Sequence, residues 1–226
     1  MKRVQIIGAG AVGLLVASFL VELNWDVHIV CRRQNQADLL NLGLKRENND
    51  GSVTEVKVKA STSMLYNADL TIVAVKSGQL SDIIGNLPKE TPIIFLQNGL
   101  AHYDLVSSLS WEHMAFGSAQ FGAYKVSDNI VSHRGRGVLK LAYLHKEASN
   151  DFLKPLLEMN HDDFPVVFEA DAEHMLIEKA IFNSLINPLT ALLCLKNGEL
   201  LTNKHAYKLL KRIYTELEQC FPNHCP

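Results

Sequence analysis

The sequence lacks the features of a secreted or nucleic-acid-binding protein. Its four cysteines among 226 residues, Cys31, Cys194, Cys220 and Cys225, are too few and too scattered for a disulfide scaffold. Charge of one sign is also missing, because 22 basic and 24 acidic residues leave a net charge of −2. No general basic field is therefore available to bind nucleic acid or an anionic membrane, and any anion site must be local.

Long apolar runs are absent as well. Lys2 and Arg3 precede an apolar stretch, as in a signal peptide, but Gly8, Gly10 and Gly13 interrupt it. No run approaches the roughly 20 residues that a membrane span requires. Neither H-E-x-x-H nor G-x-S-x-G occurs, so hydrolase chemistry has no support. We expect a cytoplasmic, globular protein.

The first half of the chain alternates predicted strands with predicted helices. Such alternation favours an α/β fold, in which a mostly parallel sheet is covered by helices on both faces. Strands are predicted over residues 4–7, 26–30, 53–58, 69–75 and 91–96, and helices over 11–23, 34–44 and 80–87.

The pattern changes after about residue 113 and becomes helical from residue 171 to 220. An interruption is expected at Asn187–Pro188, because Pro188 lacks an N–H and clashes with the carbonyl of Ser184. The chain is thus expected to form a Rossmann-type domain over residues 1–169 and an all-α domain over 170–226. Before that boundary, strands are predicted at 114–124, 129–132, 138–143 and 165–168, a turn at 134–137 and a helix at 150–158.

A glycine-rich turn follows the first predicted strand. Residues 8–13, Gly-Ala-Gly-Ala-Val-Gly, fit the pattern G-x-G-x-x-G at the opening of a helix. The first glycine permits the turn, the second admits a pyrophosphate, and the third allows close packing of helix on strand. The N–H groups of the helix would bind the anion. A dinucleotide site is favoured over a glycine turn that serves only as a turn.

The end of the second predicted strand indicates which dinucleotide binds. An NAD site usually has an acidic residue there to hold the ribose hydroxyls. Here Cys31 is followed by Arg32 and Arg33, whose guanidinium groups can bind a 2′-phosphate through paired hydrogen bonds. The alternative is that both are solvated surface arginines. The sequence favours NADP.

Three polar residues share one stripe of the predicted C-terminal helix. Lys179, Asn183 and Asn187 are spaced i, i+4 and i+8 among apolar neighbours. They either bind a substrate or satisfy backbone groups at the expected kink, and the spacing alone does not decide. Lys76 and Asn98 each follow a predicted parallel strand, where open α/β sheets bind ligands.

Five motifs together resemble the ketopantoate reductase (2-dehydropantoate 2-reductase) family. They are G-A-G-A-V-G at 8–13, A-V-K-S-G-Q at 74–79, F-L-Q-N-G at 95–99, K-x-x-x-N-x-x-x-N-P-L-T-A-L at 179–192 and K-N-G-E-L at 196–200. The resemblance implies NADPH-dependent reduction of 2-dehydropantoate to pantoate, on the route to pantothenate and coenzyme A. A reductase of another branched 2-keto acid and a catalytically silent NADP-binding protein remain alternatives.

The resemblance also implies roles for individual residues. Lys179 matches the catalytic lysine, which also contacts the substrate, and Asn98 matches a residue that touches both cofactor and substrate. The other substrate positions are Asn183, Asn187 and Asn197. The other cofactor positions are Gly8, Ala9, Gly10, Ala11, Val12, Gly13, Arg32, Lys76 and Ala123. No metal is implied, since Cys220, His224 and Cys225 form an incomplete ligand set.

The resemblance fails at the C-terminus. Family members continue with further helices that carry a carboxylate and a serine at the active site, and nothing in this sequence matches them. On this basis we expect intact NADPH binding with weak or absent reduction, and either self-association, such as a homodimer, or a longer native protein. The apolar faces expected to be exposed are those of Leu200, Leu209, Leu210, Ile213 and Leu217.

Overall fold

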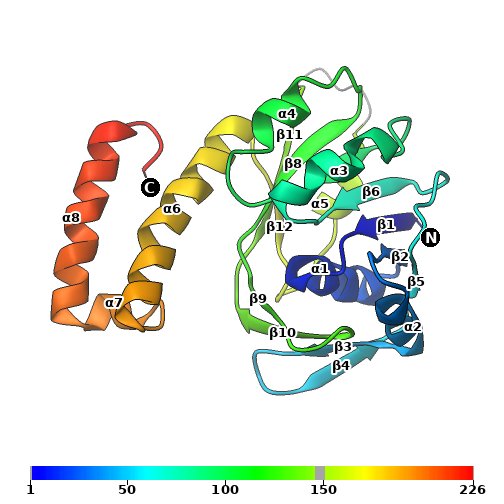
Figure 1. Cartoon of the computed structure of the whole chain (residues 1–226), viewed down its shortest axis with the longest axis horizontal. Helices are drawn as coiled ribbons and strands as arrows, with labels where there is room; N and C mark the ends of the chain where they lie inside the picture. The colour runs from blue at the N-terminus through cyan, green and yellow to red at the C-terminus, as the bar shows by residue number, and fades with distance from the viewer. Residues whose placement is uncertain (1, 146–150, 226) are drawn as a thin grey trace. The chain divides into compact units, whose positions relative to one another are not determined.

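The computed structural model describes residues 2–145 and 151–225, which divide into two compact units. The N-terminal unit comprises residues 1–97 and 101–172, and the helical unit comprises 98–100 and 173–226 (Figure 1). The division after Ala172 lies close to the boundary expected at residue 169. The short segment 98–100, which groups with the helices, was not expected from the sequence.

An eight-stranded sheet organises the N-terminal unit and confirms the predicted α/β class. All neighbouring strands run parallel except β8 and β11, which are antiparallel. The strand order is β12-β11-β8-β7-β6-β1-β2-β5. The strands are β1 (Arg3–Ile7), β2 (Asp26–Val30), β5 (Lys59–Ser61), β6 (Leu70–Val73), β7 (Ile93–Phe95), β8 (Met114–Ala119), β11 (Leu139–Tyr143) and β12 (Val166–Phe168).

A second, four-stranded sheet lies on the other side of α1 (Ala11–Glu22), which contacts strands of both sheets (Figure 1). α1 is therefore the centre of the core, and its residue Phe19 is fully buried against Phe164 at a ring separation of 4.7 Å. The second sheet has the order β4-β3-β10-β9. Its strands are β3 (Leu44–Glu47), β4 (Val53–Val56), β9 (Gly122–Lys125) and β10 (Ile130–Gly135).

The second sheet corrects several predictions. The strand predicted over 114–124 is two strands, β8 and β9, which belong to different sheets. The strand predicted over 53–58 is β4 alone, and β5 follows it in the other sheet. The turn predicted over 134–137 begins within β10. Alternation within one strand does not reveal which sheet the strand joins, because both sheets bury one face against the same core.

The remaining helices of the N-terminal unit are short. The helix predicted over 34–44 ends at Leu42, because Gly43 adopts φ 145° and Leu44 starts β3. The helix predicted over 80–87 is divided into one α-helical turn, α3, and a 3₁₀ turn, η2. The helix predicted over 150–158 is limited to α5, and residue 150 lies outside the described residues. The elements are α2 (Gln34–Leu42), η1 (Ser77–Gln79), α3 (Leu80–Ile83), η2 (Ile84–Asn86), α4 (Tyr103–Ser107) and α5 (Lys154–Leu157).

The helical unit consists of α6 (Ala172–Leu193), α7 (Glu199–Thr202) and α8 (Lys204–Cys220). Its small core contains Leu185, Leu189, Leu200 and Ala206. Leu200 is fully buried, so the expectation that it exposes an apolar face is wrong. Leu209 is 41% exposed, and Leu210, Ile213 and Leu217 pack partly against the core.

The interruption expected at Pro188 is not a break, because α6 continues through it. The Thr190 hydroxyl donates to the carbonyl oxygens of Ile186 and Asn187 at 3.1 and 3.0 Å. Leu185 and Leu189 are buried on either side of the proline. Their burial and these hydrogen bonds offset the one backbone hydrogen bond that proline removes. No helix in residues 2–145 and 151–225 is long and apolar enough to cross a membrane.

Candidate active site

The glycine turn is held tightly between β1, β6 and α1. Gly8 adopts φ 114°, and its N–H donates to the carbonyl of Val30 at 3.0 Å. A Cβ on Gly8 would lie 2.8 Å from backbone atoms of Ala74 and Val75, and a Cβ on Gly13 would overlap the carbonyl oxygen of Gly8. Glycine is required at both positions by close backbone approach.

Gly10 has a different environment. No atom lies within 4 Å of the position that its Cβ would occupy, and it caps α1 in an extended conformation without a side-chain hydrogen bond. The first turn of α1 therefore begins with N–H groups that no side chain caps, beside an open surface at Gly10. This arrangement fits a pyrophosphate group at the helix N-terminus.

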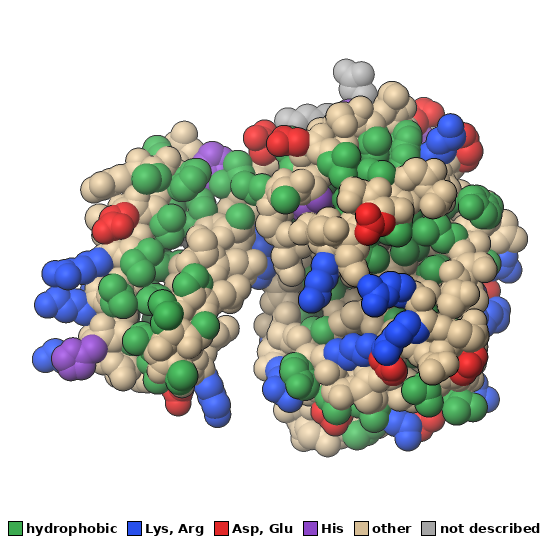
Figure 2. All heavy atoms as spheres, viewed as in Figure 1, with side chains coloured by type: hydrophobic (Ala, Val, Ile, Leu, Met, Phe, Trp, Pro, Cys, Tyr) green, Lys and Arg blue, Asp and Glu red, His purple; other side chains and the backbone are tan. Residues whose placement is uncertain are grey.

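Charged groups surround the end of β2. Cys31 is buried there, and burial raises the pKa of its thiol to about 11, so it is uncharged at neutral pH. Arg32 is exposed, and no ion pair holds it within the described ranges. Arg33 donates to both carboxylate oxygens of Asp128 at 2.8 and 3.0 Å, and Lys125 Nζ lies 2.7 Å from the same carboxylate. Figure 2 shows basic side chains gathered near the middle of this face of the N-terminal unit.

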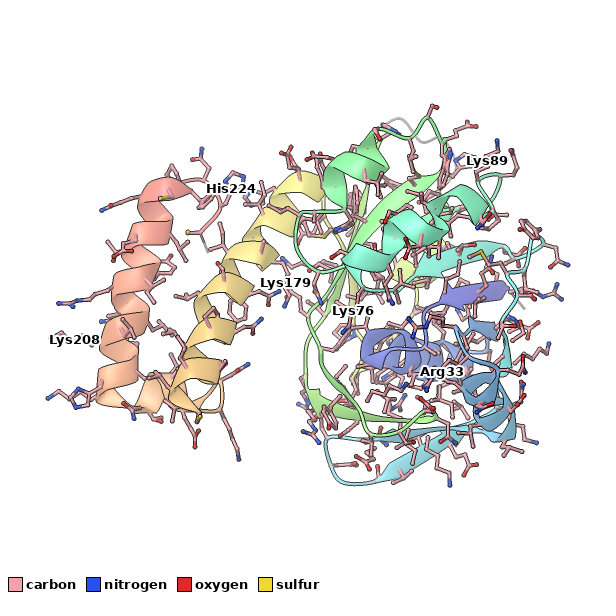
Figure 3. All side chains as sticks on the ribbon, in the orientation of Figure 1. Arg33, Lys76, Lys89, Lys179, Lys208 and His224 are labelled. Carbon is pink, nitrogen blue, oxygen red and sulfur yellow. The ribbon has the colours of Figure 1, made fainter. Side chains whose placement is uncertain are left out.

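The other predicted cofactor residues of this unit lie on neighbouring elements. Lys76 is exposed just before η1, in the segment that follows β6, and Figure 3 labels it together with Arg33. Ala123 lies on β9, which packs against α1. The structure thus brings the glycine turn, Arg32, Lys76 and Ala123 together in one unit.

The predicted substrate residues belong to the helical unit. Lys179 is half-buried on α6, its Nζ lies 5.5 Å from the ring centroid of Phe182, and desolvation lowers its pKa. Asn183 is partly buried and Asn187 is exposed on the same helix. Asn98 groups with this unit, and Asn197 is exposed just before α7.

A cavity of about 390 Å³ in the N-terminal unit and one of about 430 Å³ in the helical unit lie apart from most of these residues. The first is lined by residues just before β1 and β2, such as Lys2 and Trp25. The second is lined by Asn197 and mainly apolar side chains, without Lys179, Asn183 or Asn187. Across the described residues, no group of three histidine, cysteine or acidic side chains is placed to hold a metal ion.

Two buried glutamines beside the glycine turn were missed by the sequence reasoning. Gln36 donates to the carbonyls of Ala9 and Asp128, both at 3.0 Å. Gln97 donates to the carbonyls of Val73 and Val75 at 3.0 and 3.3 Å. No sequence motif contains Gln36. Gln97 lies within the F-L-Q-N-G motif at 95–99, directly before Asn98, and this position is the signal that could have drawn attention to it.

The sheet order and the glycine turn together define a dinucleotide-binding protein of the Rossmann class. Comparison with known families then assigns the chain more narrowly. Residues 4–146 match the family described as Ketopantoate reductase PanE/ApbA, and residues 171–224 match its C-terminal part. The chain belongs to the ketopantoate reductase family.

Individual relatives agree with this assignment. The chain is 39% identical to a 2-dehydropantoate 2-reductase of Bacillus subtilis, over 95% of this chain and 72% of the relative. It is 35% identical to that of Listeria monocytogenes, over 97% and 76%.

Solved structures show the same fold. A probable 2-dehydropantoate 2-reductase from Bacillus subtilis superposes with a TM-score of 0.80 at 37% identity, covering 96% of this chain and 75% of that one. A D-mandelate dehydrogenase solved with NADH and anilino(oxo)acetate has a TM-score of 0.83 at 21% identity, covering 100% and 76%. The second likeness shows the fold alone.

Proposed function

We propose that this chain reduces 2-dehydropantoate to pantoate with NADPH. The observation that carries the proposal is the 39% identity with a 2-dehydropantoate 2-reductase over 95% of the chain. The open surface at Gly10 and the uncapped N-terminus of α1 supply the local chemistry for the cofactor.

NADPH, when bound, supplies the hydride. The residues that we propose to hold it are Gly8, Ala9, Gly10, Ala11, Val12, Gly13, Arg32, Lys76, Asn98 and Ala123. Arg32 is proposed to bind the 2′-phosphate, since β2 ends in an uncharged thiol rather than a carboxylate that would repel it.

Lys179 is the proposed catalytic residue. Its ammonium group donates a hydrogen bond to the keto oxygen and then transfers that proton to it. As hydride would add to the carbon, the C=O double bond becomes a C–O single bond, with one new C–H bond and one new O–H bond. The lowered pKa of Lys179, caused by desolvation, favours this transfer near neutral pH. Asn98, Asn183, Asn187 and Asn197 are the proposed substrate-binding residues.

The reaction is tested by following NADPH oxidation in single turnover, with protein in excess over NADPH so that slow reduction is also detected. We expect oxidation with 2-dehydropantoate and much less with 2-ketoisovalerate. The reverse preference would assign another branched 2-keto acid. NADPH binding without oxidation by either compound would contradict a reductase and leave a silent NADP-binding protein.

The proposed catalytic role is tested with Lys179→Ala. We expect a loss of about 100-fold or more in the single-turnover rate, a common scale for a general acid, with NADPH affinity retained. Asn183→Ala should weaken substrate binding more than cofactor binding. Lys208→Ala, which changes an exposed lysine on α8, is the matched control (Figure 3). A near-normal rate for Lys179→Ala would make the lysine structural.

The cofactor preference is tested by comparing affinities for NADPH and NADH. NADPH should bind more tightly by about 1–3 kcal/mol, the scale of charge-assisted hydrogen bonds. Arg32→Ala should remove much of this preference and leave NADH affinity unchanged. Equal affinity of the unmodified protein for the two cofactors would refute NADP specificity.

We further infer a cytoplasmic location and a homodimer. The homodimer is in keeping with a dimeric ketopantoate reductase from Staphylococcus aureus among the structural relatives.

A further inference from the structure

A carboxylate joins two cations that are distant in sequence. Asp128 lies in the turn between β9 and β10, where its side chain accepts hydrogen bonds from Arg33 and from Lys125. We call Arg33, Lys125 and Asp128 the basic triad. Because two cations share one carboxylate, the triad carries one net positive charge.

Two observations place the basic triad beside the glycine turn. The Gln36 amide, 5% exposed, bonds the carbonyl of Ala9 within that turn and the carbonyl of Asp128 within the triad. Burial is the main cause of the raised pKa of the Cys31 thiol. The charge of Lys125 lowers this pKa, and the charge of Asp128 raises it further. Both ionic groups are thus within electrostatic reach of the end of β2.

The triad keeps its cationic groups available to a ligand. The Arg33 side chain is 58% exposed, and its pairing with Asp128 occupies one guanidinium nitrogen out of three. Lys125 donates one of its three N–H groups to Asp128. The remaining donors can bind an anion while the carboxylate holds both side chains in place. Such pre-organisation lowers the entropy lost on binding.

We propose that Arg33 and Lys125, held by Asp128, form a second cationic position for the 2′-phosphate of the dinucleotide, beside Arg32. This inference rests on the proposed NADP preference and adds a residue from β9 to its determinants. The phosphate would then contact residues of two segments, the β2–α2 connection and the β9–β10 hairpin. The arginines that follow Cys31 in the sequence indicate only the first of these segments.

The test separates the 2′-phosphate from the rest of the nucleotide. Binding of 2′,5′-ADP and of 5′-AMP, which differ only by that phosphate, is measured by calorimetry at low salt. Arg33→Ala and Lys125→Ala should each weaken 2′,5′-ADP binding by about tenfold, the scale of one charge-assisted hydrogen bond. Neither should change 5′-AMP binding, and Lys125→Arg should retain most of the 2′,5′-ADP affinity.

Lys59→Ala is the matched control. Lys59, on β5, places its Nζ 2.8 Å from Asp26 at the opposite end of β2. This variant therefore also removes a lysine–carboxylate pair, but one away from the basic triad. We expect its affinity for both nucleotides to equal that of the unmodified protein.

The outcomes distinguish this inference from the proposed function. Unchanged 2′,5′-ADP binding in the Arg33 and Lys125 variants, or an equal loss of 5′-AMP binding, would overturn the role of the triad. If the unmodified protein bound 2′,5′-ADP no better than 5′-AMP, the NADP preference itself would fail. The unmodified protein could instead bind 2′,5′-ADP much more tightly than 5′-AMP, and only Arg32→Ala could abolish this preference. That result would retain the proposed function and overturn this inference.

Discussion

The side-chain amide of Gln97 donates to the carbonyl of Val75 at 3.3 Å, and thereby ties the end of β7 to the segment that follows β6. A second hydrogen bond from the same amide reaches Val73 at 3.0 Å. Gly8 packs directly on Ala74 and Val75. Gln97 therefore supports the backbone behind the glycine turn, while the next residue on each segment, Asn98 or Lys76, is a proposed cofactor contact.

Gln97→Leu should weaken NADPH binding about three- to tenfold, because both hydrogen bonds to this segment are lost. Removing two buried hydrogen bonds should also lower the free energy of unfolding by about 1–3 kcal/mol. Fluorescence titration with NADPH and urea denaturation measure the two effects. Gln219→Leu, at an exposed site on α8, is the control. Unchanged cofactor affinity in a destabilised Gln97→Leu variant would limit Gln97 to a structural role.

Gly10→Ala should separate cofactor binding from stability. A Cβ at Gly10 meets no protein atom within 4 Å, so the thermal midpoint should stay within a few degrees of normal. The same methyl group would occupy the surface proposed for the pyrophosphate, so NADPH affinity should fall by about tenfold or more. Gly85→Ala, which also meets no atom within 4 Å, is the control. Normal NADPH affinity of Gly10→Ala would argue against this position for the pyrophosphate.

His102 should make the protein less stable in acid. His102 is 1% exposed, its ring packs against that of Phe116, and burial lowers its pKa to about 4 from 6.5. Between these values the unfolded chain binds a proton that the folded chain does not, so stability falls as pH decreases from about 6.5 to 4. The loss amounts to about 2–3 kcal/mol.

His102→Phe should remove this part of the acid sensitivity. The free energy of unfolding, measured by urea denaturation at pH 7 and pH 4.5, should differ less between the two pH values for the variant than for the unmodified protein. The variant should be at least as stable at pH 7, since neither ring nitrogen of His102 has a partner among the described residues. His205→Gln, at an exposed site, should leave the difference unchanged. An identical pH dependence with and without His102 would contradict the shifted pKa.

Glu22→Gln should destabilise the N-terminal unit. Arg46, which is 3% exposed, lies 2.6 Å from the Glu22 carboxylate and 3.8 Å from the ring centroid of Phe19. Removing the carboxylate leaves a buried cation without its counterion, at a cost of about 3 kcal/mol. Glu55→Gln, which alters the exposed pair with Lys45, should cost less than about 1 kcal/mol. If urea denaturation showed that both variants lose the same free energy of unfolding, the burial of Arg46 would not increase the cost of removing its counterion.

Self-association should occur through the helical unit. Leu192, Leu201 and Phe221 are 80%, 64% and 42% exposed. The core of the helical unit is small. Contact between copies would remove such apolar side chains from water. Light scattering should report a dimer or larger species, and Leu192→Lys with Leu201→Lys should shift it toward the monomer. A monodisperse monomer of the unmodified chain would refute the prediction.

The sequence predicted the features that depend on neighbouring residues. The glycine turn, β1, α1 and β2 arise from short apolar runs and one motif, and their bounds agree closely with the structure. β3 was missed because its sequence, Leu-Lys-Arg-Glu, is mostly charged. Arg46 is nevertheless buried within it by pairing with Glu22 on α1. No periodicity over a few residues reveals such a pair.

The candidate site shows the same limit. Arg32 was found from its position at the end of the second predicted strand, and Lys179 from its spacing with Asn183 and Asn187 and from a family motif. Their roles remain proposals. Asp128 and Lys125 lie in a hairpin without any motif, and only the fold brings them to Arg33, 95 positions away from Asp128. Pro188 was misread for the converse reason, since burial of its neighbours Leu185 and Leu189 outweighs a local preference against helix.

The four-stranded sheet has a consequence for how the chain is made. β3 pairs in parallel with β10, and the Asn129 side chain donates to the carbonyl of Gly43 across 86 positions of sequence. During synthesis, the β3–β4 hairpin leaves the ribosome long before β10 exists. The apolar surface of α1 that faces this sheet, including Phe19, stays uncovered on the nascent chain over that interval. The N-terminal unit is therefore most in need of a chaperone while its middle third is being translated, before the last strand of the small sheet arrives.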